Sequence, residues 1–493
     1  MNEVSSGIAV ALVILGTLVL GIYGLRVSRT TSDFYVASRT VPPRWNAAAI
    51  CGEYLSAASF LGVAGLVLAY GVDMLWYPAG FTAGYVIQLA LVAAPLRRSG
   101  VYTLPDFAEW RLESLVVRRL ASVMVVGIGW LYMMPQLKGA GLTLSTVAGT
   151  PLWAGAGVTA MVVATNVVAG GMRSITFVQA FQFWLKLAAI AVPAVFMLLV
   201  VNGTHGPAVS PGARWALPLR QGDHPLYVAY GLIVALFLGV MGLPHVAVRF
   251  YSSPDARAAR RTSAAVVGLL GMFYLFPSVY GVLGRLRAPD LLATGRTDTV
   301  VLILPGRLIG GTTGQLLTAL VAGGAFAAFL AASSGLTVAM AGVISQDVLL
   351  RGDVRSFRLA AVLASVIAFA GSLAIGNIPL ATVVQMAFAT TASSLCPLLV
   401  LGIWWRRLTA AGAAAGLICG GGTALTAVLV AVSGGPASGW GHALLAYPAA
   451  WTVPLGFATT IGVSLLTRRS APAGVGRMMV RLHTPEALLR PSR

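Results

Sequence analysis

The residue best placed to do chemistry in this 493-residue chain is Glu53, which stands inside a long apolar stretch. It belongs to the run AICGEYLSAASFLG (49–62), where small and hydroxyl-bearing residues surround it. A carboxylate at bilayer depth is costly unless it pairs, takes up a proton or faces water. We therefore interpret Glu53 as part of a cation- or proton-linked site. The alternative is a protonated, hydrogen-bonded structural carboxyl near the cytoplasmic end of its helix.

Two apolar stretches carry residues that interrupt helices. Around Glu53, small residues such as Gly52 and Ser56 let the backbone unwind, and the freed carbonyls can bind a cation. The later stretch LFLGVMGLPHVAVRF (236–250) places Gly242 just before Pro244, which removes a helical donor. Two broken helices are typical of inverted-repeat transporters with a site at the bilayer midplane. Proline kinks in unrelated helices are the alternative.

Several further polar residues lie within apolar stretches and remain open to two interpretations. His245 either gates or relays protons near neutral pH, or is a structural histidine at a helix end. Ser333, Ser334 and Thr337 either coordinate Na⁺ or donate to the carbonyl four residues earlier. The two lysines complete this set. Lys138 has no evident partner, and we expect Lys186 to lie near a helix end and snorkel.

Composition identifies the class of protein. Hydrophobic residues make up 58% of the chain and charged residues only 10%, far from the balance of a water-soluble domain. This excludes a soluble enzyme with a single anchor and indicates a polytopic α-helical membrane protein. The net charge of +19 fits the positive-inside rule rather than nucleic-acid binding, because the basic residues lie between apolar runs. Cys51, Cys396 and Cys419 are expected to be small buried hydrophobes.

About thirteen transmembrane spans are predicted. They lie near 5–26, 46–70, 75–96, 117–147, 151–170, 175–201, 225–248, 262–285, 316–346, 358–376, 379–403, 409–432 and 446–467. Odd-numbered loops and the tail hold 25 arginines, Arg249 among them, and even-numbered loops hold six. This split predicts an external N-terminus and a cytoplasmic C-terminus.

The spans suggest four parts. Residues 1–45 contain an extra N-terminal helix and a cytoplasmic loop, and 46–403 form a ten-helix core with repeats at about 46–201 and 225–403. Residues 404–467 add two helices, and 468–493 form a basic cytoplasmic tail. We expect the stretches 202–224 and 286–315 to be irregular loops. We expect the tail to be poorly ordered near anionic headgroups.

The chain resembles the sodium:solute symporter family, and within it the cation/acetate symporter group. The segments that carry the resemblance follow one another through the membrane region: 31–62, VYTLPDFAEWRL (101–112), GGMRSITFVQAFQFWLKL (170–187), GLPHVAVRFYSSPDARAARRT (242–262), SGLTVAMAGVISQD (334–347) and LGIWWRR (401–407). The resemblance implies a LeuT-type 5+5 inverted-repeat bundle in the plasma (cytoplasmic) membrane. It also implies import of a small monocarboxylate of the acetate, propionate or pyruvate class, driven by a cation gradient.

For the anion, the resemblance and the broken helices together suggest a receptor at the half-helix that follows the first break. Its free N–H groups and positive end would face the carboxylate. Ser56, Ser59, Gly242 and His245 are the expected substrate-binding residues. Packing of small residues between helices is the alternative for the two serines.

The chain departs from the family pattern at two places. The acetate group typically has Asp where this chain has Glu53. Family members also bind Na⁺ between carbonyls, here Gly52 and Leu55, and hydroxyls of a facing helix. Those hydroxyl positions are Ala328, Ala331 and Ala332 in this chain, and Ser333 and Ser334 follow on a different helical face. The coupling ion is therefore H⁺ through Glu53, or Na⁺ at a shifted site with Ser333 or Ser334 as ligands, or the carrier is weakly coupled.

Two other classes of function compete with transport. An enzyme is not expected, because the sequence has no HExxH motif, no paired intramembrane carboxylates and no Cys/His cluster. No tightly bound cofactor is expected. A membrane sensor derived from a transporter scaffold stays open because of the alanines at the sodium positions. The sequence leaves the identity of the acid and the oligomeric state undetermined.

Overall fold

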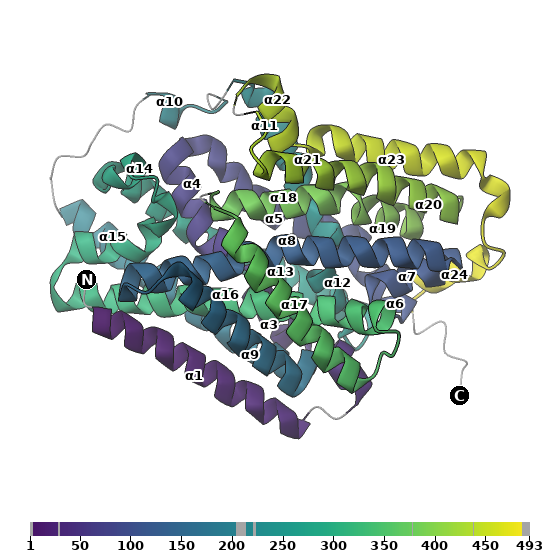
Figure 1. Cartoon of the computed structure of the whole chain (residues 1–493), viewed down its shortest axis with the longest axis horizontal. Coiled ribbons are helices and arrows are strands. Elements are labelled where there is room, and N and C mark those ends of the chain that lie inside the picture. Colours follow the sequence, from purple (N-terminus) through teal and green to yellow (C-terminus); the bar gives the residue numbers. More distant parts are fainter. Residues whose placement is uncertain are drawn as a thin grey trace.

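The computed structural model describes residues 3–27, 30–203, 213–219, 223–376, 378–436 and 438–485, and these fold into helices without a strand. The first half contains α1 Glu3–Val27, α2 Thr31–Val36, α3 Pro43–Tyr54, α4 Val63–Tyr70, α5 Trp76–Leu91, α6 Ala93–Ser99, α7 Leu104–Leu112, α8 Leu115–Ala148, α9 Leu152–Gly203 and α10 Ala213–Ala216. In Figure 1 the long helices run roughly along the longest axis, and α1 lies at the outer edge of the bundle.

The second half continues with helices of the same kind. It contains α11 Pro225–Gly242, α12 Pro244–Tyr251, α13 Ala256–Arg287, α14 Asp290–Ala293, α15 Val300–Ile309, α16 Gly311–Val343, α17 Val354–Ala374, α18 Leu380–Ser393, α19 Leu395–Trp404, α20 Ala410–Gly416, α21 Thr423–Val432, α22 Gly439–Ala446, α23 Ala449–Leu466 and α24 Val475–His483. Short 3₁₀ turns are Ala37–Arg39, Gly71–Leu75, Thr297–Thr299 and Arg468–Ser470, and π-helical turns are Ala58–Gly62, Ile344–Val348 and Leu417–Gly422.

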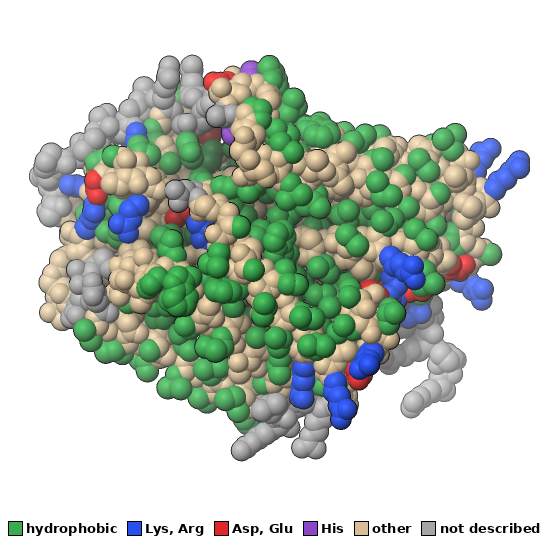
Figure 2. Space-filling view, in the orientation of Figure 1, with side chains coloured by type: hydrophobic (Ala, Val, Ile, Leu, Met, Phe, Trp, Pro, Cys, Tyr) green, Lys and Arg blue, Asp and Glu red, His purple; other side chains and the backbone are tan. Residues whose placement is uncertain are grey.

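Eleven of the described helical segments are long and apolar enough to cross a membrane. Two of them, Ala58–Leu91 and Leu152–Val201, each extend over two neighbouring predicted spans. Within α9 the backbone turns at Gly171, whose φ of 52° is a left-handed value that favours glycine. Figure 2 shows hydrophobic side chains across the middle of this face, with most charged side chains towards its two ends. The prediction of an all-helical membrane protein is confirmed.

The centre of the bundle is α16. In its most apolar window 89% of the residues are buried, whereas the corresponding value for α1 is 22%. Helix α16 packs against α9, α8, α1 and α3. The buried face of α16 is rich in alanine and glycine, which lets neighbouring backbones approach closely. Elements from both halves of the chain therefore meet around this helix.

Two predictions of irregular structure were wrong. Part of the tail forms α24, because Val475, Met479 and Leu482 give it one apolar face that is buried against the bundle. The Arg98 guanidinium donates to the Leu482 carbonyl (2.9 Å), which ties α24 to α6. The stretch 286–315 contains α14 and α15, since the start of α15 is apolar enough to bury its side chains. Most of 202–224, and the residues after 485, lie outside the described part of the chain.

The orientation remains a prediction that cysteine labelling can test. Ala293 lies in a predicted external loop and Leu350, which is 80% exposed, in a predicted cytoplasmic one. We expect a membrane-impermeant thiol reagent to label Ala293→Cys in intact cells and Leu350→Cys only after permeabilisation. The unsubstituted protein, with its three native cysteines, gives the background. The opposite labelling pattern would reverse the topology.

Candidate functional site

The first helix break follows α3, and protein side chains satisfy the backbone there. Helix α3 ends at Tyr54, and Leu55 leaves the helical region with ψ of 83°. The next regular turn begins at Ala58, so the predicted interruption is confirmed. The N–H of Ala57 donates to the Gln136 side-chain oxygen of α8 (2.7 Å). The Gln136 side chain therefore accepts the hydrogen bond that water would accept from this N–H group outside a membrane.

The second break separates α11 from α12. Helix α11 ends at Gly242, Leu243 has extended backbone angles, and α12 begins at Pro244. The backbone at Gly242 lies very close to neighbouring side chains. A Cβ at this position would overlap side-chain atoms of Leu395 and Thr391, so glycine is required here. This break is also confirmed. Its consequence is a short helix, α12, that begins inside the bundle and carries both His245 and Arg249.

Glu53 and Arg249 form an ion pair that joins the two broken helices. The distance from Arg249 Nε to Glu53 Oε2 is 2.7 Å, and the side chains are 0% and 1% exposed. The prediction that Arg249 is a loop arginine was wrong. The other carboxylate oxygen, Oε1, has no hydrogen-bond partner among the described residues. Removal of one member of such a pair leaves an unbalanced buried charge.

Further hydrogen bonds hold the Arg249 guanidinium in place. Arg249 Nη1 donates to Thr176 Oγ1 of α9 (2.7 Å), and Nη2 donates to Gln179 Oε1. The Gln179 amide in turn donates to the Ala331 carbonyl of α16 (2.7 Å). The arginine thus connects α3, α9, α12 and α16. Sequence reasoning missed Thr176 and Gln179, because neither is unusual in an apolar helix.

The predicted substrate residues lie in a buried cluster of aromatic rings. We call this cluster the aromatic site and define it by Ser56, Ser59, Phe81, Tyr132, His245, Tyr274 and Phe388. Tyr132 donates to Ser56 (3.4 Å), and Ser59 shares a hydrogen bond with Tyr274 (2.8 Å). The His245 ring lies 5.1 Å from the Tyr132 ring, and neither of its nitrogens has a partner in the described part of the chain.

The rest of the aromatic site is apolar. Phe388 of α18 lies 5.8 Å from Tyr132 and 5.1 Å from Phe81, measured between ring centroids. Phe81 also stacks on Tyr274 at 5.8 Å. The structure therefore brings Ser56, Ser59 and His245 near the same rings. Small polar groups sit against large apolar faces, an arrangement typical of small-molecule sites.

Lys186 occupies the carbonyls at the end of α3. Its ammonium donates to the carbonyl of Gly52 and to that of Leu55 (2.9 Å). The side chain is 0% exposed and lies in the middle of the second half of α9. The expectation that Lys186 snorkels to the surface was wrong, because these carbonyls supply a partner within the bundle. Lys138 is also partnered, since its ammonium donates to the Ile378 carbonyl (2.7 Å).

The expected sodium positions lie on the buried α16. Ala328, Ala331 and Ala332 are fully or almost fully buried and offer no side-chain oxygen. Ser333 and Ser334 are buried as well, and the Ser333 hydroxyl has no partner among the described residues. The carbonyl positions expected from the family pattern, Gly52 and Leu55, face the Lys186 ammonium.

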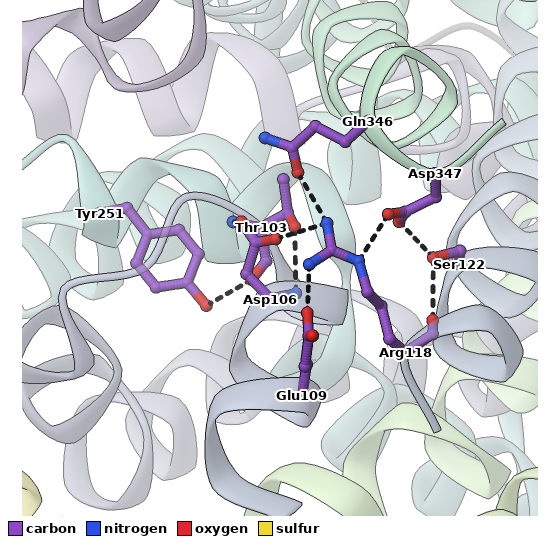
Figure 3. A network of polar contacts seen from close by, with 8 residues as sticks. All are labelled: Thr103, Asp106, Glu109, Arg118, Ser122, Tyr251, Gln346 and Asp347. Atoms are coloured by element: carbon purple, nitrogen blue, oxygen red, sulfur yellow. Dashed lines mark hydrogen bonds and ion pairs between the residues drawn. The ribbon is translucent and has the colours of Figure 1, made fainter. Parts of the chain in front are cut away.

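A second polar network lies at the predicted cytoplasmic end of the bundle and was not recognised in the sequence (Figure 3). Arg118 of α8 forms ion pairs with Asp106 (2.9 Å), Glu109 and Asp347 (2.6 Å). Burial raises the pKa of the Asp106 carboxyl, and Arg118 opposes that shift. Ser122 donates to Asp347. The network ties α7 and α8 to the end of α16. Because Arg118 and Asp347 are far apart in sequence, residue spacing gave no sign that they meet.

Comparison with known proteins gives a consistent picture. A model of the sodium:solute symporter family matches residues 34–420. The uncharacterized symporter YwcA of Bacillus subtilis is 31% identical over 471 residues, which cover 90% of each chain. A monocarboxylic acid transporter of Corynebacterium glutamicum is 30% identical over 480 residues, which cover 88% of this chain and 86% of that one.

Solved structures agree on the fold. A Na⁺-coupled sialic acid symporter in a substrate-bound outward-open state matches with a TM-score of 0.72 and 15% identity, over 93% of this chain and 98% of that one. MhsT in complex with L-phenylalanine matches with a TM-score of 0.57 and 13% identity, over 84% and 98%. These likenesses show the fold alone. The LeuT-type architecture expected from the sequence is confirmed.

The Glu53–Arg249 pair predicts a large stability effect. Arg249→Ala should lower the free energy of unfolding by about 3–5 kcal/mol, because Glu53 would stay buried without its partner. Arg307→Ala is the matched control. This substitution removes an exposed ion pair between Arg307 and Asp290 (2.7 Å). The hydrogen bonds from Arg307 lower the pKa of Asp290. Exposed pairs of this kind contribute about 0–1 kcal/mol to stability. Thermal unfolding in detergent measures both variants, and equal losses would contradict the prediction.

Gly335 of α16 predicts a steric effect on the same pair. A Cβ at Gly335 would overlap the carboxylate of Glu53, whereas a Cβ at Gly268 of α13 would meet nothing within 4 Å. Gly335→Ala should therefore destabilise by about 1–3 kcal/mol through overpacking. Gly268→Ala should be neutral or stabilising by up to about 1 kcal/mol, through helix propensity. The same thermal assay decides, and a Gly335→Ala protein as stable as the Gly268→Ala protein would refute the close contact.

Proposed function

This chain belongs to the sodium:solute symporter family, and we propose that it carries a small monocarboxylate across the plasma membrane together with a cation. Family membership makes it a multi-pass transport protein rather than an enzyme. The acid class is our own inference. It is supported by the name of the Corynebacterium glutamicum relative and by the chemistry of the aromatic site.

One observation carries the proposal. Two helices lose their winding inside the bundle, after Tyr54 and after Gly242, and the half-helix that follows the second break begins beside unpartnered polar groups. A discontinuous helix at bilayer depth is tolerated where it lines a binding site. In such transporters the positive N-terminal end of a half-helix faces an anionic substrate.

The carboxylate of the acid is proposed to bind at the start of α12. His245 lies at the second position of that helix, and both of its ring nitrogens are free of partners in the described residues. Gly242 lets the end of α11 approach Thr391 and Leu395 closely, which fixes where α12 begins. Ser56 and Ser59 would supply hydroxyl donors, and Phe388 and Phe81 would contact the short apolar part of the acid. Aromatic walls around few polar groups favour a small anion over a larger, polar solute.

Alternating access is proposed to use the two repeats, 46–201 and 225–403, each of which opens on a broken helix. Residues 1–45 and 404–467 would flank this core, and 468–493 would form the cytoplasmic tail. The Arg118 network would hold the predicted cytoplasmic ends of α8 and α16 together. Such a contact would have to open when the acid is released inward.

Glu53 is proposed as the carboxylate that links the cation to transport. Its pairing with Arg249 supports this role, since any change of charge near Glu53 is felt at α12 and so at the aromatic site. A sensor built on a transporter scaffold and a weakly coupled carrier are the alternatives. A sensor would bind the acid without moving it, and a weakly coupled carrier would move it without accumulation.

Uptake by proteoliposomes tests the proposal. We expect labelled acetate, propionate or pyruvate to accumulate above the level of protein-free vesicles when a Na⁺ or H⁺ gradient is imposed. Glu53→Gln should abolish gradient-driven accumulation, because the charge of Arg249 is then unbalanced. Glu113→Gln, at an exposed position beyond α7, is the matched carboxylate control. Unchanged accumulation in Glu53→Gln would remove Glu53 from the mechanism, and binding without uptake would favour the sensor.

A further inference from the structure

The end of α3 is a cation site that already contains a cation of the protein itself. The last carbonyls of a helix lack hydrogen-bond partners within the helix, and they carry its negative dipole end. In transporters with broken helices, such ends bind the coupling ion. Here the carbonyls of Gly52 and Leu55 receive the ammonium of Lys186, which is fully buried. The side chain thus provides the positive charge at this point.

The surrounding residues do not fit Na⁺. A hard cation such as Na⁺ is held by several oxygen ligands, and the carbonyl oxygens available here are already hydrogen-bonded to Lys186. The expected hydroxyl positions on α16 are Ala328, Ala331 and Ala332, which offer no oxygen. The Ala331 carbonyl is itself engaged by Gln179 (2.7 Å). A Na⁺ ion would have to displace the ammonium, and the three alanines would offer it no side-chain oxygen.

We propose that Lys186 replaces sodium in this chain, and that the coupling ion is one proton carried on the Lys186 amine. The inference deepens the proposed function and rests on it. It assigns the ion that the family pattern left open and the residue that carries it. Glu53 then acts beside Lys186 as the fixed negative charge, rather than as the group that receives the proton.

The charges of the buried cluster support a transport stoichiometry of one proton for each acid anion. Lys186 of α9 faces Glu53 and Cys51 of α3, and Arg249 of α12 pairs with Glu53. On α16, Gly335 lies against the Glu53 carboxylate and brings no charge, and His245 of α12 has no hydrogen-bond partner among the described residues. With a protonated Lys186 and ionised Glu53, the cluster carries one net positive charge. A bound monocarboxylate would neutralise it, and loss of a proton would neutralise the empty site.

The transport cycle alternates between two neutral states: the loaded site, with both the proton and the anion, and the empty site, with neither. On the outside, the amine takes a proton from water and the anion binds near α12. On the inside, the anion leaves and the Lys186 N–H bond breaks, so the proton passes to water as hydronium and a neutral amine remains. A state with only one of the two ligands would bury a net charge in a low dielectric, which is unfavourable. Symport of one proton with one anion is therefore electroneutral overall.

Labelled pyruvate in proteoliposomes tests this inference. Pyruvate is chosen because it is a stronger acid than acetate, so little of it crosses the lipid undissociated, and protein-free vesicles measure that leak. A pH gradient of one unit, alkaline inside, should drive accumulation to about tenfold, since each tenfold concentration ratio corresponds to about 1.4 kcal/mol. A Na⁺ gradient alone, or an imposed K⁺ diffusion potential, should leave accumulation unchanged.

Variants of the two lysines locate the proton. Lys186→Met should lose pH-driven accumulation. Lys138→Met is the matched control, because Lys138 is the other lysine of the chain and also donates to a backbone carbonyl, and it should retain accumulation. If Lys186→Met does not fold, the driving ion of the unsubstituted protein still decides the question.

The outcomes separate this inference from the proposed function. Exchange of internal for external labelled pyruvate without any gradient reports the carrier itself, and its absence would overturn the proposed function. Exchange together with accumulation driven by Na⁺ would leave the carrier in place and overturn the role of Lys186, in favour of a shifted site such as Ser333 and Ser334. Full pH-driven accumulation by Lys186→Met would overturn it as well.

Discussion

A backbone that leaves the helical conformation inside a membrane must find its hydrogen-bond partners within the protein, because lipid offers none. This constraint governs the centre of the structure. At the end of α3 the carbonyls of Gly52 and Leu55 receive Lys186, and the N–H of Ala57 donates to Gln136. The interruption is thus stabilised by side chains from α8 and α9, which fixes both helices against the break. The proposed ion site and the contacts that stabilise the break are therefore the same set of atoms.

The charged groups that serve the breaks also have to balance one another. Glu53 is the partner of Arg249 and a near neighbour of Lys186, so one carboxylate serves two cations. Thr176 and Gln179 of α9 accept hydrogen bonds from the two remaining guanidinium nitrogens of Arg249. An excess of one positive charge in a buried cluster is unfavourable by itself. It becomes an advantage where the substrate is an anion, because binding then removes the imbalance.

The sequence predicted the features that break a local rule. Glu53 is a charge in an apolar run, and the glycines and Pro244 interrupt helical patterns, so both breaks were located within a few residues. Partners were harder to predict, since pairing depends on the packing of distant helices. Arg249 follows Pro244 closely and resembled a loop residue, and Lys186 resembled a snorkelling lysine, although both are fully buried. Arg118 and Asp347 are more than two hundred residues apart, and spacing gave no sign that they meet.

Helix α12 connects the two parts of the centre. His245 and Arg249 are four residues apart, and so lie on the same face about one turn from each other. A ligand that binds His245 in the aromatic site would also act on Arg249, whose guanidinium pairs with Glu53 (2.7 Å). Glu53 belongs to the turn of α3 whose carbonyls hold Lys186. The eight residues of α12 therefore join the proposed place of the anion to the proposed place of the proton.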